Sequence, residues 1–291
     1  MEIKEHLSAL QDAGVRLAAA AERAGVDAPV PTCPGWRVRD LLEHLGGVHR
    51  WAAAYVATGR TEPFTDEEAA VFFTAPDDAG LVGWYREGHT ALVRTLREAD
   101  PGTTCWAFLR APSPLAFWAR RQAHETAIHM IDAEAAAAAA SPGDAGGIAP
   151  STAASPGDAD GIASPRDAAP GTGGSASTAR AIASFTPAFA ADGVDELFDG
   201  FLPRRRGRLV ADPPVSLAVR ATDHPTAWTV RVEPGGRAVT PGADAADCVV
   251  SGPARELYLM LWNRGGAEAL DVRGDRSVLE LWREKSVIVW S

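Results

Sequence analysis

A glutamate and a histidine near the middle of the chain, Glu125 and His129, are four residues apart. In an α-helix of 3.6 residues per turn this spacing places both side chains on one face, about one turn apart. A carboxylate and an imidazole in that arrangement can bind the same metal ion, each at about 2 Å. Because such pairs are also common on solvated helix faces, a metal site needs a ligand from a second segment.

Two histidines, His44 and His49, could provide that further ligand from an apolar-periodic segment over residues 38–56. They lie on opposite flanks of its apolar stripe, so helical periodicity does not choose between them. Either could instead be a core histidine with a satisfied hydrogen bond. If one of them faces Glu125 and His129, three protein ligands leave a fourth position open for water or substrate. That pattern is typical of catalytic zinc rather than structural zinc.

Neighbouring residues could support or compete with this chemistry. Asp132 lies one turn beyond His129 and could orient its imidazole through a hydrogen bond. His124 projects about 140° away from His129 and is not expected to reach the same ion. Cys33 could be a nucleophile, but a buried or loop thiol is the simpler interpretation. The sequence contains no GxSxG, no P-loop and no GxGxxG after a strand.

The candidate ligands fall in an N-terminal region, residues 1–137, in which apolar residues recur at helical spacing. A proline-rich loop over 29–36 must end the first helix. Four helices joined by loops predict a four-helix bundle. The helices are expected over residues 3–17, 38–56, 80–99 and 115–137.

Residues 138–178 consist almost wholly of Ala, Gly, Ser, Pro, Asp and Thr and contain a near-duplicate, ASPGDAGGIA at 140–149 and ASPGDADGIA at 154–163. No apolar periodicity survives there, so burial cannot offset the entropy of ordering. The composition predicts a flexible low-complexity linker between two domains.

Residues 179–291 mix helical and strand-like patterns without βαβ regularity, which predicts a small α+β domain. Together with the bundle, this gives the whole chain an α+β fold class. The patterns predict one or two helices from about Phe185, and strands over 215–221, 227–232 and 247–250. They also predict helices over 254–262 and 278–282, and a final strand over 286–290.

Composition restricts the function classes. The net charge of −10 and the pI near 5.2 argue against a nucleic-acid partner, and the one basic run, over 204–208, is short. The three cysteines, Cys33, Cys105 and Cys248, form no CxxC, so a cysteine zinc site and a disulfide framework are both unexpected. The N-terminus is charged and no apolar stretch approaches the length that spans a bilayer. We therefore expect a soluble cytoplasmic protein without membrane association.

Two runs carry a resemblance to a known family: PTCPGWRVRDLLEHL at 31–45 and HETAIHMIDA at 124–133. Both resemble signatures of the mycothiol-dependent maleylpyruvate isomerase family, and segments at 191–196, 250–264 and 272–275 resemble its C-terminal part. The resemblance implies a DinB-like bundle that holds a divalent ion such as Zn²⁺. It selects His44 over His49 and assigns Glu125 and His129 as the other ligands. Met130 departs from the arginine often found there.

The resemblance also implies mycothiol as a cosubstrate and a C-terminal arginine, Arg264, that holds an acidic substrate. A thiol bound to zinc is deprotonated at neutral pH, and the thiolate is a nucleophile toward a small electrophile. The expected function is thus a mycothiol-dependent isomerase or S-transferase. The alternative is a metal- or small-molecule-binding protein without turnover, since fold does not fix function.

Overall fold

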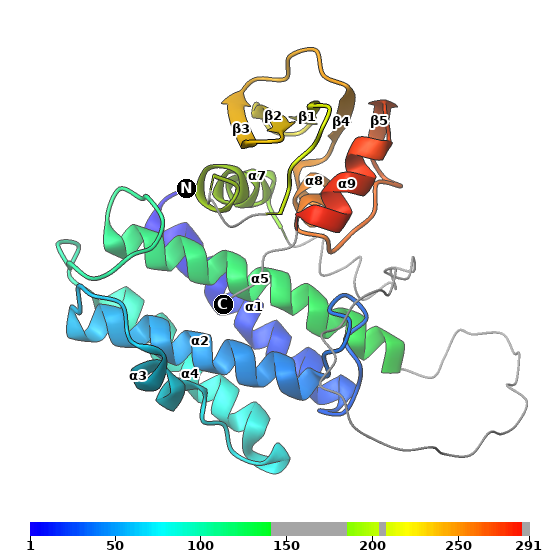
Figure 1. The fold of residues 1–291 in the computed structure, drawn as a ribbon. Coiled ribbons are helices and arrows are strands. Elements are labelled where there is room, and N and C mark those ends of the chain that lie inside the picture. Colours follow the sequence, from blue (N-terminus) through cyan, green and yellow to red (C-terminus); the bar gives the residue numbers. More distant parts are fainter. Residues whose placement is uncertain (141–184, 204–207, 287–291) are drawn as a thin grey trace, which may run out of the picture.

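The computed structural model describes residues 1–140, 185–203 and 208–286. Four long helices form the N-terminal bundle, which confirms the expected four-helix architecture (Figure 1). They are α1 (Ile3–Ala24), α2 (Val38–Thr58), α4 (Asp78–Glu98) and α5 (Pro114–Ala140). Between α2 and α4 lie two short elements that were not expected, α3 (Asp66–Ala70) and η1 (Val71–Phe73). None of their residues is buried, so the sequence shows no apolar periodicity there.

The proline-rich loop is folded back on itself before α2. Val30 N donates to Trp36 O at 2.9 Å, and Trp36 N donates to Cys33 O at 3.0 Å. Gly35 adopts a φ of 88°, a left-handed conformation that glycine takes readily. The turn places Trp36 directly before α2, which carries His44.

Helix α5 is enclosed on all sides, and every residue from Arg121 to Glu134 is buried. One side of the helix packs against the bundle and the other faces the C-terminal domain (Figure 1). A helix in this position must bury its polar side chains as well, and each buried polar group then needs a partner. The polar residues of α5 are therefore the natural place for a site.

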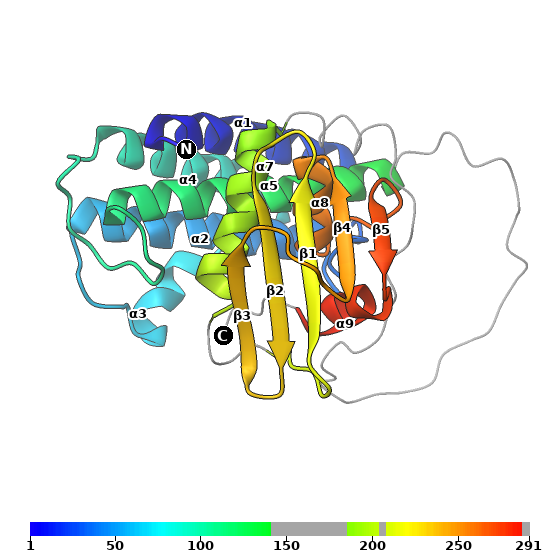
Figure 2. The same cartoon turned by 90° about the horizontal axis from the view of Figure 1, so that it is seen from above.

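The C-terminal domain is an α+β unit, as predicted. Its sheet has the strand order β3-β2-β1-β4-β5, with β1 and β4 parallel and the other pairs antiparallel (Figure 2). The strands are β1 (Val215–Ala221), β2 (Ala227–Glu233), β3 (Gly236–Pro241), β4 (Cys248–Gly252) and β5 (Asp271–Gly274). The helical elements are α7 (Pro187–Asp195), the π-helical turn η2 (Glu196–Phe201), α8 (Ala254–Leu261) and α9 (Ser277–Lys285).

The helices α7 and α8 lie between the sheet and α5, so the domain meets the bundle through its helical layer (Figure 1). The inner residues Leu217, Val219 and Val250 are buried beneath that layer. Strands β3 and β5 were not predicted, because β3 has no buried residue and β5 has four residues with none buried.

Parts of the predicted organisation fall outside the described residues. The linker predicted over 138–178 begins within the last turn of α5, which runs to Ala140, and its remainder is not described. The final strand predicted over 286–290 also lies outside the described residues, apart from Ser286, which follows the end of α9. Within the described ranges, no helix combines the length and apolarity needed to cross a bilayer.

Candidate metal centre

The structure brings together the three predicted ligands from two helices, His44 of α2 and the pair Glu125 and His129 of α5. Nε2 of His44 lies 3.1 Å from Oε1 of Glu125, and Nε2 of His129 lies 3.5 Å from the same oxygen. One ligand atom of each residue lies within 4.8 Å of the others. The His44 side chain is 18% exposed while the other two are nearly buried, so the group is reached from the His44 side.

Both α5 ligands are held by a further side chain. Nδ1 of His129 donates to Oδ2 of Asp132 at 2.8 Å, which leaves Nε2 directed toward Glu125. Nη2 of Arg121 donates to Oε2 of Glu125 at 2.8 Å, which leaves Oε1 for the histidines. A carboxylate on the far nitrogen of a histidine is the usual support of a metal ligand. Two imidazoles and one carboxylate oxygen therefore fit a divalent ion such as Zn²⁺.

The electrostatics of the group favour positive charge. Burial alone would lower the pKa of His129, but hydrogen bonds to Asp132 and Glu125 and their charges raise it to about 9. Burial would raise the pKa of Glu125, yet the hydrogen bonds from His129 and His44 and the charge of Arg121 hold it well below its ordinary value. Glu125 is thus a carboxylate, and the site attracts a cation between its ligands.

Asp132 is the centre of a second set of contacts that includes the predicted Arg264. Thr32 Oγ1 donates to Asp132 Oδ1 at 2.5 Å, and Cys33 Sγ donates to Oδ2 at 3.3 Å. Arg264 Nε donates to Oδ1 at 2.8 Å and Nη2 to Oδ2 at 3.1 Å. The guanidinium expected to hold a substrate is therefore bound to Asp132. Its role in holding a substrate stays a prediction, and the contact with Asp132 was not predicted.

Cys33 is poorly suited to act as a nucleophile. Burial and the neighbouring charge of Asp132 raise the pKa of its thiol far above the ordinary value, and Arg264 offsets only part of that shift. The thiol stays protonated at neutral pH and donates to Asp132. This agrees with the interpretation of Cys33 as a buried loop thiol.

The remaining histidines of these helices lie elsewhere. His49 is fully buried, and its Nε2 lies 2.9 Å from the hydroxyl of Thr126. His124 does not join the ligand set, as its angle around α5 predicted. Its Nε2 lies 2.8 Å from Oδ2 of Asp192 in α7.

The carboxylate of Asp192 contacts four cationic or titratable groups of the bundle, which are His6, Arg120, His124 and the N-terminal amine at 3.9 Å. His6 Nε2 lies 3.0 Å from Oδ2, and Arg120 Nε donates to the same oxygen at 2.9 Å. The cluster fastens α7 to α1 and α5. Sequence reasoning missed it, because Asp192 lies beyond the low-complexity region and no spacing links it to His6 or His124.

A hollow of about 450 Å³ opens beside His44. Its lining consists of Gly35, Trp36, Asp40, Glu43, His44 and Phe73. The ring of Trp36 stacks on His129 with centroids 6.0 Å apart and meets His44 edge-on at 5.3 Å. The hollow therefore gives access to the ligand set, with an indole along one wall.

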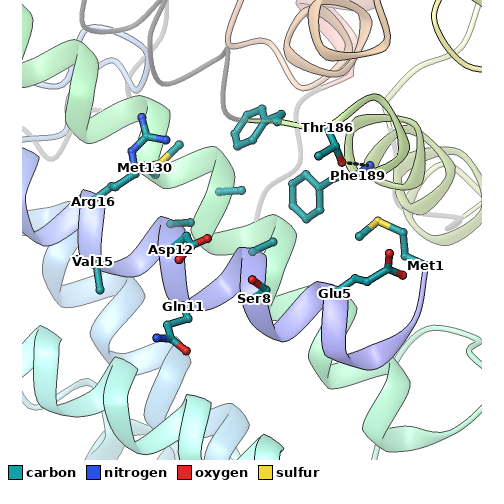
Figure 3. A pocket seen from close by; sticks show the side chains of 14 residues that line it. Met1, Glu5, Ser8, Gln11, Asp12, Val15, Arg16, Met130, Thr186 and Phe189 are labelled. Carbon is teal, nitrogen blue, oxygen red and sulfur yellow. Dashed lines mark hydrogen bonds between the residues drawn. The ribbon is translucent and has the colours of Figure 1, made fainter.

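A separate hollow of about 600 Å³ lies between α1, α5 and the start of α7, next to Phe185 and Phe189 (Figure 3). From α5 it is lined by Ala127 and Met130, and no ligand-set residue lines it. The larger hollow is therefore not the one that serves the candidate metal centre.

A helical bundle with a His-Glu-His set between α2 and α5, packed through α5 against an α+β domain, defines a two-domain protein built around one candidate metal centre. Family models match both parts. Residues 7–134 match the model described as mycothiol maleylpyruvate isomerase N-terminal domain, and residues 188–281 match the MDMPI C-terminal domain. The chain belongs to the mycothiol-dependent maleylpyruvate isomerase family, as its sequence motifs indicated.

Solved structures with the same fold include two of a mycothiol-dependent maleylpyruvate isomerase. Its H52A mutant has 12% sequence identity to this chain and the other structure has 13%; both have a TM-score of 0.55. Each alignment covers 94% of this chain and 93% of the other chain. At this identity the likeness establishes the two-domain fold. Comparison with curated proteins gave no match.

Proposed function

We propose that this protein is a mycothiol-dependent enzyme that adds the thiol of mycothiol to a small electrophilic alkene, as an S-transferase or as a cis-trans isomerase. The observation that carries the proposal is the His44, Glu125 and His129 set, of which His44 lines an open hollow. Family membership and the fold shared with a mycothiol-dependent isomerase support the choice of thiol.

His44, Glu125 and His129 would hold a divalent ion, for which Zn²⁺ is our expectation. When bound, such an ion lowers the pKa of a coordinated thiol so that the thiolate forms at neutral pH. Asp132 fixes the His129 ring through Nδ1, and Arg121 fixes the Glu125 carboxylate through Oε2. These contacts keep the free ligand atoms aimed at one point before any substrate arrives.

The chain does not need a nucleophile of its own, since the thiol of the cosubstrate supplies one. Sulfur bonds to one alkene carbon as the π bond breaks. If the sulfur leaves again after rotation about the former double bond, the product is the trans isomer. If a proton instead reaches the neighbouring carbon, the thioether remains and the reaction is S-transfer. Which branch is followed depends on the electrophile.

The three cysteines Cys33, Cys105 and Cys248 are all free thiols. Unpaired cysteines and a low-molecular-weight thiol as cosubstrate both suit the reducing cytoplasm, and we expect the protein to act there.

The test is elemental analysis of the purified protein followed by titration with mycothiol in the metal-loaded and metal-stripped forms. We expect about one zinc per chain and mycothiol binding that requires the metal. If the reconstituted protein binds neither metal nor mycothiol, the proposal fails. If metal and mycothiol bind but no electrophile is turned over, the alternative of a non-catalytic binding protein is correct.

A further inference from the structure

The arginine of the C-terminal domain that lies beside Asp132 is already neutralised. Arg264 binds both carboxylate oxygens of Asp132, and its Nη1 donates to the carbonyl oxygen of Trp262 at 3.1 Å. Its Nη2 also donates to Cys33 Sγ at 3.3 Å. Arg121, which contacts the ligand Glu125, lies between the carboxylates of Glu125 and Glu196 and is 1% exposed. Neither arginine lines the hollow beside His44.

The arginines that flank the hollow in sequence point to other acids. Arg39 lies 3.1 Å from Asp27 Oδ1 and 2.5 Å from Asp78 Oδ2, and Arg37 lies 3.5 Å from the same Asp27 oxygen. Neither lines the hollow. Within the described part of the chain, the lining includes no arginine or lysine.

The walls of the hollow instead carry two carboxylates, Asp40 and Glu43. One oxygen of Asp40 accepts a hydrogen bond from Arg37 N at 2.7 Å at the start of α2. For Glu43, no hydrogen bond or ion pair is found among the described residues. Glu43 lies one position before His44 and so presents an uncompensated negative charge at the entrance to the ligand set.

We infer that the electrophile of this enzyme is uncharged or cationic rather than a dicarboxylate, and that Glu43 is a determinant of this selectivity. The inference rests on the proposed function. A keto diacid such as maleylpyruvate brings two negative charges toward a thiolate, past Asp40 and Glu43, and meets no guanidinium in the described lining of the hollow. An uncharged alkene avoids that repulsion, and a cationic one is attracted.

The experiment uses the full-length, metal-loaded protein with mycothiol and three acrylamides that share one reacting alkene. They are acrylamide itself, the anionic N-acryloylglycine and the cationic N-aminopropyl acrylamide. Sulfur bonds to the terminal alkene carbon, the π bond breaks, and the thiol proton reaches the carbon beside the carbonyl. No oxidant or reductant is required. Each kcat/KM is divided by the uncatalysed rate constant of the same acrylamide, which removes differences in intrinsic reactivity.

We expect the normalised kcat/KM of N-acryloylglycine to be about tenfold below that of the other two at low ionic strength, a gap that salt narrows. In Glu43→Gln the ratio of the cationic to the anionic substrate should fall about threefold to tenfold. Glu98→Gln, which removes an exposed carboxylate at the end of α4, should leave that ratio unchanged.

A preference for N-acryloylglycine, or a Glu43→Gln ratio equal to that of the unmodified protein, would overturn the inference and leave the proposed function standing. Absence of a catalysed rate with all three acrylamides would overturn the S-transfer branch of the proposed function, and the inference with it.

Discussion

Arg264 of the C-terminal domain binds both carboxylate oxygens of Asp132 in α5, at 2.8 Å to Oδ1 and 3.1 Å to Oδ2. The same carboxylate accepts the hydrogen bond from Nδ1 of His129 at 2.8 Å. The residue that orients a predicted metal ligand is therefore also one of the residues that bind the second domain. Domain docking and ligand orientation are coupled through Asp132.

Replacement of the predicted ligands should remove the metal. His44→Ala and His129→Ala each delete one of three ligands, so each variant should lose most bound zinc while α1, α2, α4 and α5 stay folded. Elemental analysis measures the metal and far-ultraviolet circular dichroism the helices. His224→Ala is the matched control, because His224 contacts Thr226 in the C-terminal domain. Full metal occupancy in both ligand variants would disprove the assignment.

Asp132→Asn should weaken metal binding without deleting a ligand. The amide can still accept from His129, but it loses the charge that supports the imidazole, and we expect the dissociation constant for zinc to rise about 10- to 100-fold. Competition with a chromogenic chelator measures the affinity. Glu134→Gln is the control, since Glu134 is buried in the same helix and pairs with Arg23 at 2.7 Å instead. Equal affinities in the two variants would show that Asp132 has only a structural role.

The contact between α7 and the bundle leaves no room for a side chain at Gly193. A Cβ at this position would lie 2.3 Å from Cε2 of Tyr258 and 2.8 Å from Nδ1 of His124. Gly193→Ala should therefore lower the free energy of unfolding by about 1–3 kcal/mol through overpacking. In Gly83→Ala of α4 a Cβ meets nothing within 4 Å, and helix propensity should raise stability by about 1 kcal/mol. Urea unfolding measures the free energy of unfolding of both variants. Changes of the same sign and similar size would contradict the prediction.

Two buried histidines in the bundle predict a stability loss in mild acid. Burial lowers the pKa of both His49 and His89 below the ordinary value of 6.5. Their stability contribution is present above pH 6.5. Below pH 6.5 these histidines are protonated in the unfolded chain but stay neutral in the folded chain. The free energy of unfolding should then fall by up to about 1.4 kcal/mol per pH unit for each histidine.

Chemical unfolding between about pH 7 and pH 5.5 measures this slope, with carboxylates contributing mainly at lower pH. His89→Gln removes one titrating group while its amide can still donate to Leu10 O, which His89 Nε2 contacts at 3.0 Å. The slope should decrease in the variant. An unchanged slope would mean that His89 does not contribute to it.

The sequence was sufficient to predict those parts of the fold and of the candidate site that depend on contacts between residues close in the chain. The spacing of Glu125 and His129 and the helical periodicity of the bundle follow from about one turn of backbone geometry. The same angle argument excluded His124 from the ligand set. Strands β1 and β4 were found because their inner residues, such as Val219 and Val250, are buried.

The sequence was insufficient to predict side-chain contacts between segments that are distant in the chain. The choice between His44 and His49 depends on which flank of α2 faces α5, and periodicity alone leaves that open. Arg264 was expected to help hold an acidic substrate, and its contact with Asp132, 132 residues away in the chain, has no signal in the sequence. The acceptor for His124 comes from α7 across 68 residues, and no local pattern encodes it.

The burial of α5 from Arg121 to Glu134 has an evolutionary consequence. This helix has no solvent face on which neutral substitutions could accumulate, so changes in it require compensating changes in the elements on both sides. Substitutions at Arg120 or His124, for example, alter the surroundings of Asp192 in the other domain. The two domains should therefore co-evolve, and chimeras that exchange one domain between distant relatives should fold poorly unless these α5 contacts are transferred with it.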